Sequence, residues 1–196
     1  MSDSKQNNTL QLIQDLFYQL LILLGEDPLR EGLVKTPERV AKALLSMLGG
    51  YTMDIKKLVN GAVFKKTGKG IVAALGIVLY SLCEHHMLPF ECHINIFYLP
   101  KDKEIGISKL ARISEMYCLR LQVQERLARE IAEEIFRVIE PEAVGIIIEG
   151  KHLCMAARGV KQQKAITQSE CFLGTFENDF TLQDSLYKRC NLRRLS

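Results

Sequence analysis

The sequence predicts an α+β fold in which helices pack on one face of an antiparallel sheet and an N-terminal helical segment comes first. Segments with helical periodicity and segments rich in β-branched and aromatic residues occur in separate pairs rather than in strict alternation. The chain has 196 residues, 47% of them hydrophobic, which is enough for one core and short for two. We therefore expect a single domain over 1–196, with a helical part at 1–50 and a core at 60–180.

The first two elements are expected to be helices at 8–24 and 37–48, because both segments carry apolar residues at helical spacing. Thr36 is the expected N-cap of the second helix, and Pro37 suits its first position. Gly49 marks its end. These two helices make up the N-terminal segment.

Beyond residue 70 the composition changes to that of a sheet followed by further helices. The expected elements are, in order, strands at 71–80 and 93–99, helices at 108–119 and 122–139, strands at 143–149 and 165–176, and a helical tail after Asp179. An apolar i, i+4 stripe marks the second of these helices. Its members are Val123, Leu127, Ile131 and Ile135.

Composition and charge argue against a general nucleic-acid-binding protein, a secreted protein and a membrane protein. Lysine and arginine number 26 against 23 acidic residues, so a net charge of +3 gives no general case for nucleic-acid binding. The N-terminus has no secretory signal pattern, which favours the cytoplasm. The apolar stretch at 16–24 is too short to span a bilayer, so we expect no membrane segment.

The densest group of metal-binding side chains lies at 83–86, at the end of a predicted strand. Cys83 and His86 have the separation that lets a short turn present both to one tetrahedral ion. In the extended segment at 152–154, His152 and Cys154 would point to the same side. Two thiolates and one imidazole suit zinc, with a fourth position left for water and nearby His85 and His152 able to move protons.

Two other interpretations of these residues stay open. A structural zinc site would recruit His85 or His152 as a fourth ligand, and cysteines are commonly buried as small hydrophobic residues. Burial is the expectation for the cysteines without such neighbours. These are Cys92, Cys118, Cys171 and Cys190. His93, within a strand, is expected to be structural.

A turn leading into a helix at 106–112 has the features of an anion site. Ser108 lies near the expected N-cap, and Lys109 and Arg112 are three residues apart on one face. Arg158, beside a flexible glycine, could add a bidentate donor, and three cations suit a polyphosphate. The alternative is that these cations merely lie on a solvated surface.

Glu125 lies off the apolar stripe of its helix. It could pair with Arg129 at i+4, which the sequence alone favours, or accept hydrogen bonds from a ligand. An ionised carboxylate supplies only acceptors, which suits the adjacent N–H donors of guanine.

Together these motifs resemble type I GTP cyclohydrolase. The matching segments are Ser-Leu-Cys-Glu-His-His at 81–86, Gly-Ile-Ser-Lys-Leu-Ala-Arg-Ile at 106–113, Gln-Val-Gln-Glu-Arg-Leu at 122–127, His-Leu-Cys-Met at 152–155 and Arg-Gly-Val at 158–160. The similarity extends upstream to 26–28 and 36–42 and downstream to 172–176. It therefore covers most of the chain.

The resemblance implies the tunnelling fold, assembled as a homodecamer of two pentamers with active sites between subunits. It also implies the reaction, in which water activated at zinc attacks carbon 8 of GTP and formate leaves. The product would be 7,8-dihydroneopterin triphosphate, the entry to folate or biopterin synthesis.

Residue roles follow from the same resemblance. Cys83, His86 and Cys154 would hold zinc, His152 would protonate the imidazole nitrogen, and His85 would assist proton transfer. Glu125 with Gln124 would anchor guanine. The expected contacts to the triphosphate and ribose are Ser108, Lys109, Arg112 and Arg158, with Arg39 and Lys42 from a neighbouring subunit.

Departures from the family pattern lie at 73–76, 91–93, 164–165 and 170, and they bear on rate and effector response. One rival is another tunnelling-fold enzyme, a nitrile reductase of queuosine synthesis with a cysteine nucleophile and NADPH. A second rival is a catalytically silent oligomer that binds purine nucleotides. The set of Cys83, His86 and Cys154 argues against the reductase, which needs no zinc.

Overall fold

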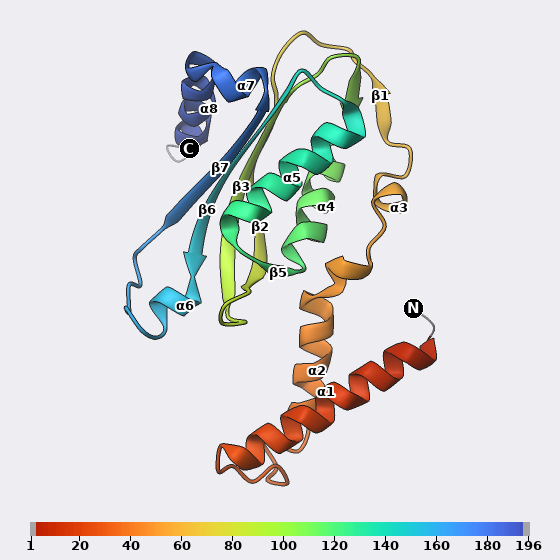
Figure 1. Cartoon of the computed structure of the whole chain (residues 1–196), viewed down its shortest axis with the longest axis vertical. Coiled ribbons are helices and arrows are strands. Elements are labelled where there is room, and N and C mark those ends of the chain that lie inside the picture. The colour runs from red at the N-terminus through yellow and green to blue at the C-terminus, as the bar shows by residue number, and fades with distance from the viewer. Residues whose placement is uncertain (1–2, 194–196) are drawn as a thin grey trace. The chain divides into compact units, whose positions relative to one another are not determined.

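The computed structural model describes residues 3–193, which divide into two compact units with the boundary between Thr52 and Met53 (Figure 1). The boundary lies two residues beyond the end of the helical part expected at 1–50. Each unit is described by itself. The expectation of a single domain over the whole chain stays a prediction.

The N-terminal unit consists of helices. It contains α1 (Asp3–Leu23), α2 (Thr36–Met47) and the 3-10 turn η1 (Gly49–Thr52). The two predicted helices are confirmed, and α1 begins earlier than expected. The expected N-cap is wrong by one residue: Lys35 is the cap and Thr36 is already helical, its hydroxyl donating to the carbonyl of Gly32 at 3.5 Å.

The C-terminal unit carries the sheet and the remaining helices. Its elements are α3 (Ile55–Val59), β1 (Val63–Lys65), β2 (Val72–Cys83), β3 (Pro89–Leu99), β4 (Lys103–Ile105), α4 (Ile107–Cys118), β5 (Leu121–Gln122), α5 (Gln124–Ile139), β6 (Ala143–His152), α6 (Leu153–Ala156), β7 (Thr167–Gly174), α7 (Thr175–Asn178) and α8 (Phe180–Arg193). The predicted order of the long strands and helices is confirmed, while the short elements α3, β1, β4, β5, α6 and α7 were not predicted. The last strand is shorter than predicted, since residues 175–176 belong to α7.

The main sheet has the strand order β5-β2-β3-β6-β7, and β1 pairs with β4 in a separate ribbon. All pairs among the four long strands are antiparallel, as predicted, while the two residues of β5 run parallel to β2. A bulge between Ala74 and Ile77 interrupts β2. Gly76 sits in it at φ +62°, and its N–H donates to Oδ1 of Asn95 at 2.9 Å.

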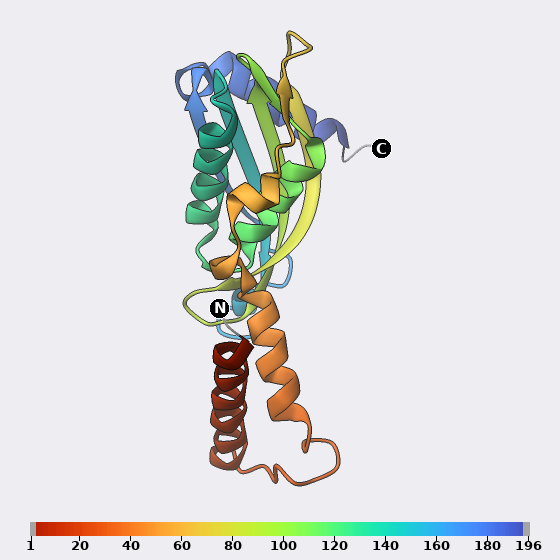
Figure 2. The same cartoon turned by 90° about the vertical axis from the view of Figure 1, so that its right-hand side faces the viewer.

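Helices α4 and α5 cover one face of this sheet, as Figure 2 shows from the side. Leu127, Ile131 and Ile135 of the predicted stripe are fully buried there. Successive residues of a strand face opposite sides, so Phe97 and Ile147 lie on the other face, where they pack with Leu186 of α8. The predicted helical cover is confirmed for α4 and α5, and α8 adds cover at one end of the second face.

In the part of the chain that the structure describes, none of the helices has the length and apolar character needed to cross a membrane. This includes the leucine-rich α1. The cytoplasmic location expected from the N-terminal sequence stays a prediction.

Candidate metal centre

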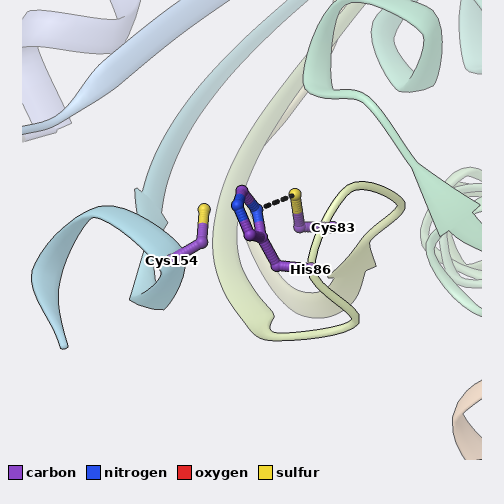
Figure 3. Close-up of side chains that lie close together, drawn as sticks. All are labelled: Cys83, His86 and Cys154. Atoms are coloured by element: carbon purple, nitrogen blue, oxygen red, sulfur yellow. Dashed lines mark hydrogen bonds between the residues drawn. The ribbon is translucent and has the colours of Figure 1, made fainter. Parts of the chain in front are cut away.

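Three side chains that are distant in the sequence meet at one end of the sheet. Cys83 ends β2, His86 lies in the turn that follows, and Cys154 lies in the short helix α6 (Figure 3). One ligand atom from each lies within 4.8 Å of the other two. The structure thus brings together the three ligands that the sequence predicted.

The spacing fits a tetrahedral zinc ion. Zinc–sulfur and zinc–nitrogen bonds of about 2.3 and 2.0 Å put neighbouring ligand atoms about 3.5–3.8 Å apart. Cys83 Sγ lies 3.7 Å from Nδ1 of His86. Neither His85 nor His152 belongs to the group, although Nδ1 of His85 is 3.9 Å from Cys83 Sγ. This favours an open coordination position over the closed structural site.

Local backbone geometry forms one half of the centre. The amide of Cys83 donates to the carbonyl of Leu88 at 2.9 Å, and the amide of Met87 donates back to the carbonyl of Cys83 at 2.7 Å. Met87 takes a left-handed conformation at φ +52°, which closes the turn. Cys83 and His86 therefore face the same space.

Strand pairing supplies the other half. In the β3–β6 register Phe90 is opposite His152, so the end of β6 lies beside the turn that carries His86. The sequence argument from strand alternation is wrong in detail, because β6 ends at His152 and Cys154 is already helical. Cys154 reaches the centre through the first turn of α6.

The pKa of the Cys154 thiol reflects both its burial and its neighbour Cys83. Burial raises the pKa of the Cys154 thiol, and the proximity of Cys83 raises it further. Two thiolates this close repel, and a divalent cation between them offsets that repulsion. The donor set therefore fits a soft metal ion such as zinc.

A pocket of about 190 Å³ adjoins the metal ligands. Its walls come from the β2–β3 turn, the start of α5, the end of β6, the short helix α6 and the first residue of β7. The lining residues are Cys83, His85, His86, Gln122, Val123, Gln124, Glu125, His152, Cys154, Met155 and Thr167. The predicted proton-transfer and guanine-binding residues thus share one hollow with the metal ligands.

His152 is held by two neighbours. Its ring stacks on Phe90 with centroids 4.3 Å apart and planes 6° from parallel, and its Nε2 lies 2.9 Å from Oε1 of Gln124. Burial lowers the pKa of His152, and the carboxylate of Glu125 opposes this by raising it.

Glu125 is exposed at the first turn of α5 and lines the pocket. The ion pair with Arg129 that the sequence favoured is not formed, and Glu125 has no salt-bridge partner among the described side chains of residues 7–190. Its carboxylate is therefore available to a ligand in the pocket.

The predicted phosphate-binding cations do not line this pocket. Lys109 donates from Nζ to the carbonyl of Leu58 at 2.8 Å, and Arg112 lines a separate hollow with Lys57. Ser108 is the second residue of α4 rather than its N-cap, which is Gly106. Arg158 is exposed beyond α6.

The two cations expected from a neighbouring subunit lie in the N-terminal unit. Arg39 and Lys42 are exposed on α2, where Nζ of Lys42 is 2.5 Å from Glu38. Their role therefore stays a prediction.

The remaining cysteines and His93 behave mostly as expected. Cys92 and Cys118 are buried, whereas Cys171 and Cys190 are only half-buried. His93 is 2.7 Å from a carboxylate oxygen of Glu91, which matches a structural role.

Sequence reasoning missed several residues that shape the site. Thr167 lines the pocket from β7, and Phe90 stacks on His152. Arg126 joins Glu84 of the metal-binding turn to the start of α5, at 2.5 Å from its carboxylate. The spacing of residues in the sequence does not predict these contacts, since each depends on strand register or on the packing of α5.

Comparisons with known proteins agree with the motifs. The model of the family described as GTP cyclohydrolase I matches residues 13–191. The GTP cyclohydrolase 1 of Leptospira biflexa is 47% identical over 169 residues, which is 86% of this chain and 92% of the relative. That of Gloeobacter violaceus is 44% identical over 186 residues, covering 94% and 87%. That of Chromohalobacter salexigens is 45% identical over 169 residues, covering 86% and 92%.

Among solved structures, the archaeosine synthase QueF-Like in its apo form aligns with 56% of this chain and 97% of its own, at 14% identity and a TM-score of 0.44. The family match and the curated relatives cover most of the sequence, and they confirm the resemblance noted from its motifs. The chain belongs to the GTP cyclohydrolase I family of enzymes and has its α+β tunnelling fold.

Proposed function

We propose that this protein is a zinc-dependent hydrolase that converts GTP and water to 7,8-dihydroneopterin triphosphate and formate. This reaction would be the first step of tetrahydrofolate or pterin biosynthesis. The observation that carries the proposal is the metal-ligand group of Cys83, His86 and Cys154, which opens into a pocket lined by His152 and Glu125. Membership of the GTP cyclohydrolase I family supports it.

Cys83, His86 and Cys154 would hold the zinc ion. When bound, zinc supplies a Lewis acid that activates water for hydrolysis at neutral pH. The three protein ligands leave a position open, which suits catalysis better than a purely structural role.

The histidines beside the metal ligands provide proton transfer. His152 faces the pocket with one ring nitrogen engaged by Gln124, so its other nitrogen can exchange a proton with the substrate. His85, exposed in the same pocket, can relay a proton to solvent.

Glu125 is the residue proposed to recognise guanine. Its unpaired carboxylate can accept both adjacent N–H donors of the base, which adenine does not offer in that arrangement. A purine held by Glu125 would lie in the pocket that contains His152 and the metal ligands.

The triphosphate needs more room than this pocket provides. Ligand sites usually measure about 300–1,000 Å³, whereas this pocket measures about 190 Å³ and has no lysine or arginine in its lining. We therefore propose that neighbouring copies complete the site in a homodecamer, with Ser108, Lys109 and Arg112 facing the pocket of another subunit. Arg158, Arg39 and Lys42 would add to the same phosphate site.

Mixed subunits test this arrangement. Cys154→Ala removes a metal ligand, and Arg112→Ala removes a phosphate contact, so each variant should be inactive alone. When both are co-expressed, some sites combine an intact pocket with an intact cation set, and activity should partly return. If each site were built within one chain, the mixture would stay inactive. Light scattering would give the number of chains in the assembly.

Incubation with GTP separates the proposed function from its rivals. The cyclohydrolase releases formate and a pterin that fluoresces after oxidation, and a zinc chelator should stop both. A nitrile reductase would consume NADPH with its own substrate and tolerate the chelator. A silent oligomer would bind GTP without releasing formate, and that result would refute the proposal.

Glu125→Gln probes guanine recognition. The amide keeps the size of the side chain but presents a donor to a donor, so KM for GTP should rise about 10- to 100-fold. Binding of inorganic triphosphate should not change. Glu133→Gln, on an exposed turn of the same helix, is the matched control. Equal losses for GTP and triphosphate would contradict the assignment.

A further inference from the structure

The side chain of Gln124 is buried and fully hydrogen-bonded. It begins α5 and is 3% exposed. Its Nε2 donates to the carbonyls of Ile148 at 3.1 Å and Thr167 at 3.2 Å. Its Oε1 lies 2.6 Å from the hydroxyl of Thr167 and 2.9 Å from Nε2 of His152. The amide therefore has no free donor or acceptor to offer a base.

These partners fix the orientation of the amide. Backbone carbonyls accept only, so the nitrogen of Gln124 must face Ile148 and the carbonyl of Thr167. The oxygen then faces the Thr167 hydroxyl, which also lies 3.2 Å from the carbonyl of Gly150 and gives its single proton to the nearer acceptor.

An acceptor next to Nε2 of His152 requires a proton on that nitrogen. In the neutral ring the lone pair is then on Nδ1, for which no hydrogen-bond partner occurs within the described chain. Stacking on Phe90 holds the ring plane. His152 is thereby set in one tautomer and one orientation beside the pocket.

The backbone leaves space for this amide at Gly150. A Cβ atom built on Gly150 would lie 2.1 Å from Oε1 of Gln124. Gly150 is paired with Thr167 in the β6–β7 register, so the missing side chain and the hydroxyl lie side by side. An alanine here would displace the end of a flexible side chain, while the strand itself could stay in place.

We propose that Gln124 is a positioning residue that acts through His152, and that Thr167 and Gly150 keep it in place. Its oxygen holds the Nε2 proton of His152. Nδ1 is then the nitrogen that takes up a proton from solvent and passes it to the substrate's imidazole nitrogen, which leaves the ring neutral again with its proton on Nε2. This inference rests on the proposed function, and it gives the guanine contact to Glu125 without the side chain of Gln124.

Steady-state kinetics of the zinc-loaded protein test the role. Gly150→Ala and Gln124→Leu should lower kcat about 10- to 100-fold, part of what a positioned proton donor supplies. KM for GTP should change less than about threefold. Thr167→Val should lower kcat, and Thr167→Ser, which keeps the hydroxyl, should restore it. A rise in KM with unchanged kcat in these variants would overturn the proposal, since it would make Gln124 a substrate contact.

The tautomer can be measured without turnover. The chain has four histidines, so solid-state NMR of ¹⁵N-histidine-labelled wild-type holoenzyme can resolve them, with His152→Gln for assignment. At about pH 8, where imidazoles are neutral, His152 should carry its proton on Nε2. A proton on Nδ1 would refute the inference, even if Gln124→Leu failed to fold. Absence of formate release by the wild type would instead refute the proposed function and leave this measurement valid.

Discussion

Removal of Cys154 should strongly weaken zinc binding and remove most of the stability that zinc provides. The centre offers three protein ligands, and Cys154 is the one contributed by α6. Structural zinc sites with four ligands bind with about 10–16 kcal/mol, or roughly 2.5–4 kcal/mol for each ligand. Losing one ligand should therefore weaken zinc binding about 100- to 1,000-fold.

The same figures give the expected thermal shift. Zinc at 100 times its Kd stabilises the wild type by about 2.7 kcal/mol, which corresponds to about 5–10 °C in Tm for a chain of this size. At that zinc concentration Cys154→Ala should gain about 0.4 kcal/mol or less, a shift of about 1 °C.

Differential scanning fluorimetry with and without zinc measures this shift, and elemental analysis gives the zinc content per chain. Cys171→Ala is the matched control, because Cys171 is a half-buried cysteine outside the metal group. Its zinc-dependent shift should equal that of the wild type, whatever its own Tm. Full zinc content and an unchanged shift in Cys154→Ala would refute the ligand assignment.

Three further predictions concern stability. Gly174→Ala should destabilise the fold by more than about 2 kcal/mol. Gly174 has φ +66°, and a Cβ there would lie 2.2 Å from the carbonyl oxygen of Glu142. A urea midpoint equal to that of the wild type would contradict this. Ile131→Ala creates a cavity at a fully buried position and should lower the free energy of unfolding by about 2–5 kcal/mol in the same measurement. Arg126→Leu loses a half-exposed ion pair, so it should cost only about 1 kcal/mol, yet slow turnover by loosening the metal-binding turn.

Much of the fold was predictable because its signals are local. Periodicity placed α5 and its buried residues Leu127, Ile131 and Ile135. Composition placed the four long strands, although not their exact ends. The cap of α2 was misplaced by one residue, because cap choice depends on the backbone angles of Lys35, which the sequence does not reveal.

In the candidate site, too, contacts between nearby residues were predictable and contacts between distant segments were not. Cys83 and His86 are three residues apart, so one turn is enough to bring them together, and their sequence spacing predicted it. Cys154 joins them only through the pairing of β3 with β6. The order of the motifs indicated the right residue, but strand alternation does not explain its position, because α6 begins at Leu153.

The sequence by itself determined which side chains are candidates for the chemistry: two thiols, the neighbouring imidazoles and the carboxylate of Glu125. Only the tertiary structure decided what each one contacts. Glu125 has no ion-pair partner within the described part of the chain, while the side-chain amide of Gln124 is fully hydrogen-bonded within the protein. The cations Lys109 and Arg112 lie away from the pocket. The physical reason is that local backbone geometry fixes neighbours a few residues apart, whereas contacts between distant segments depend on strand register and on the packing of whole helices.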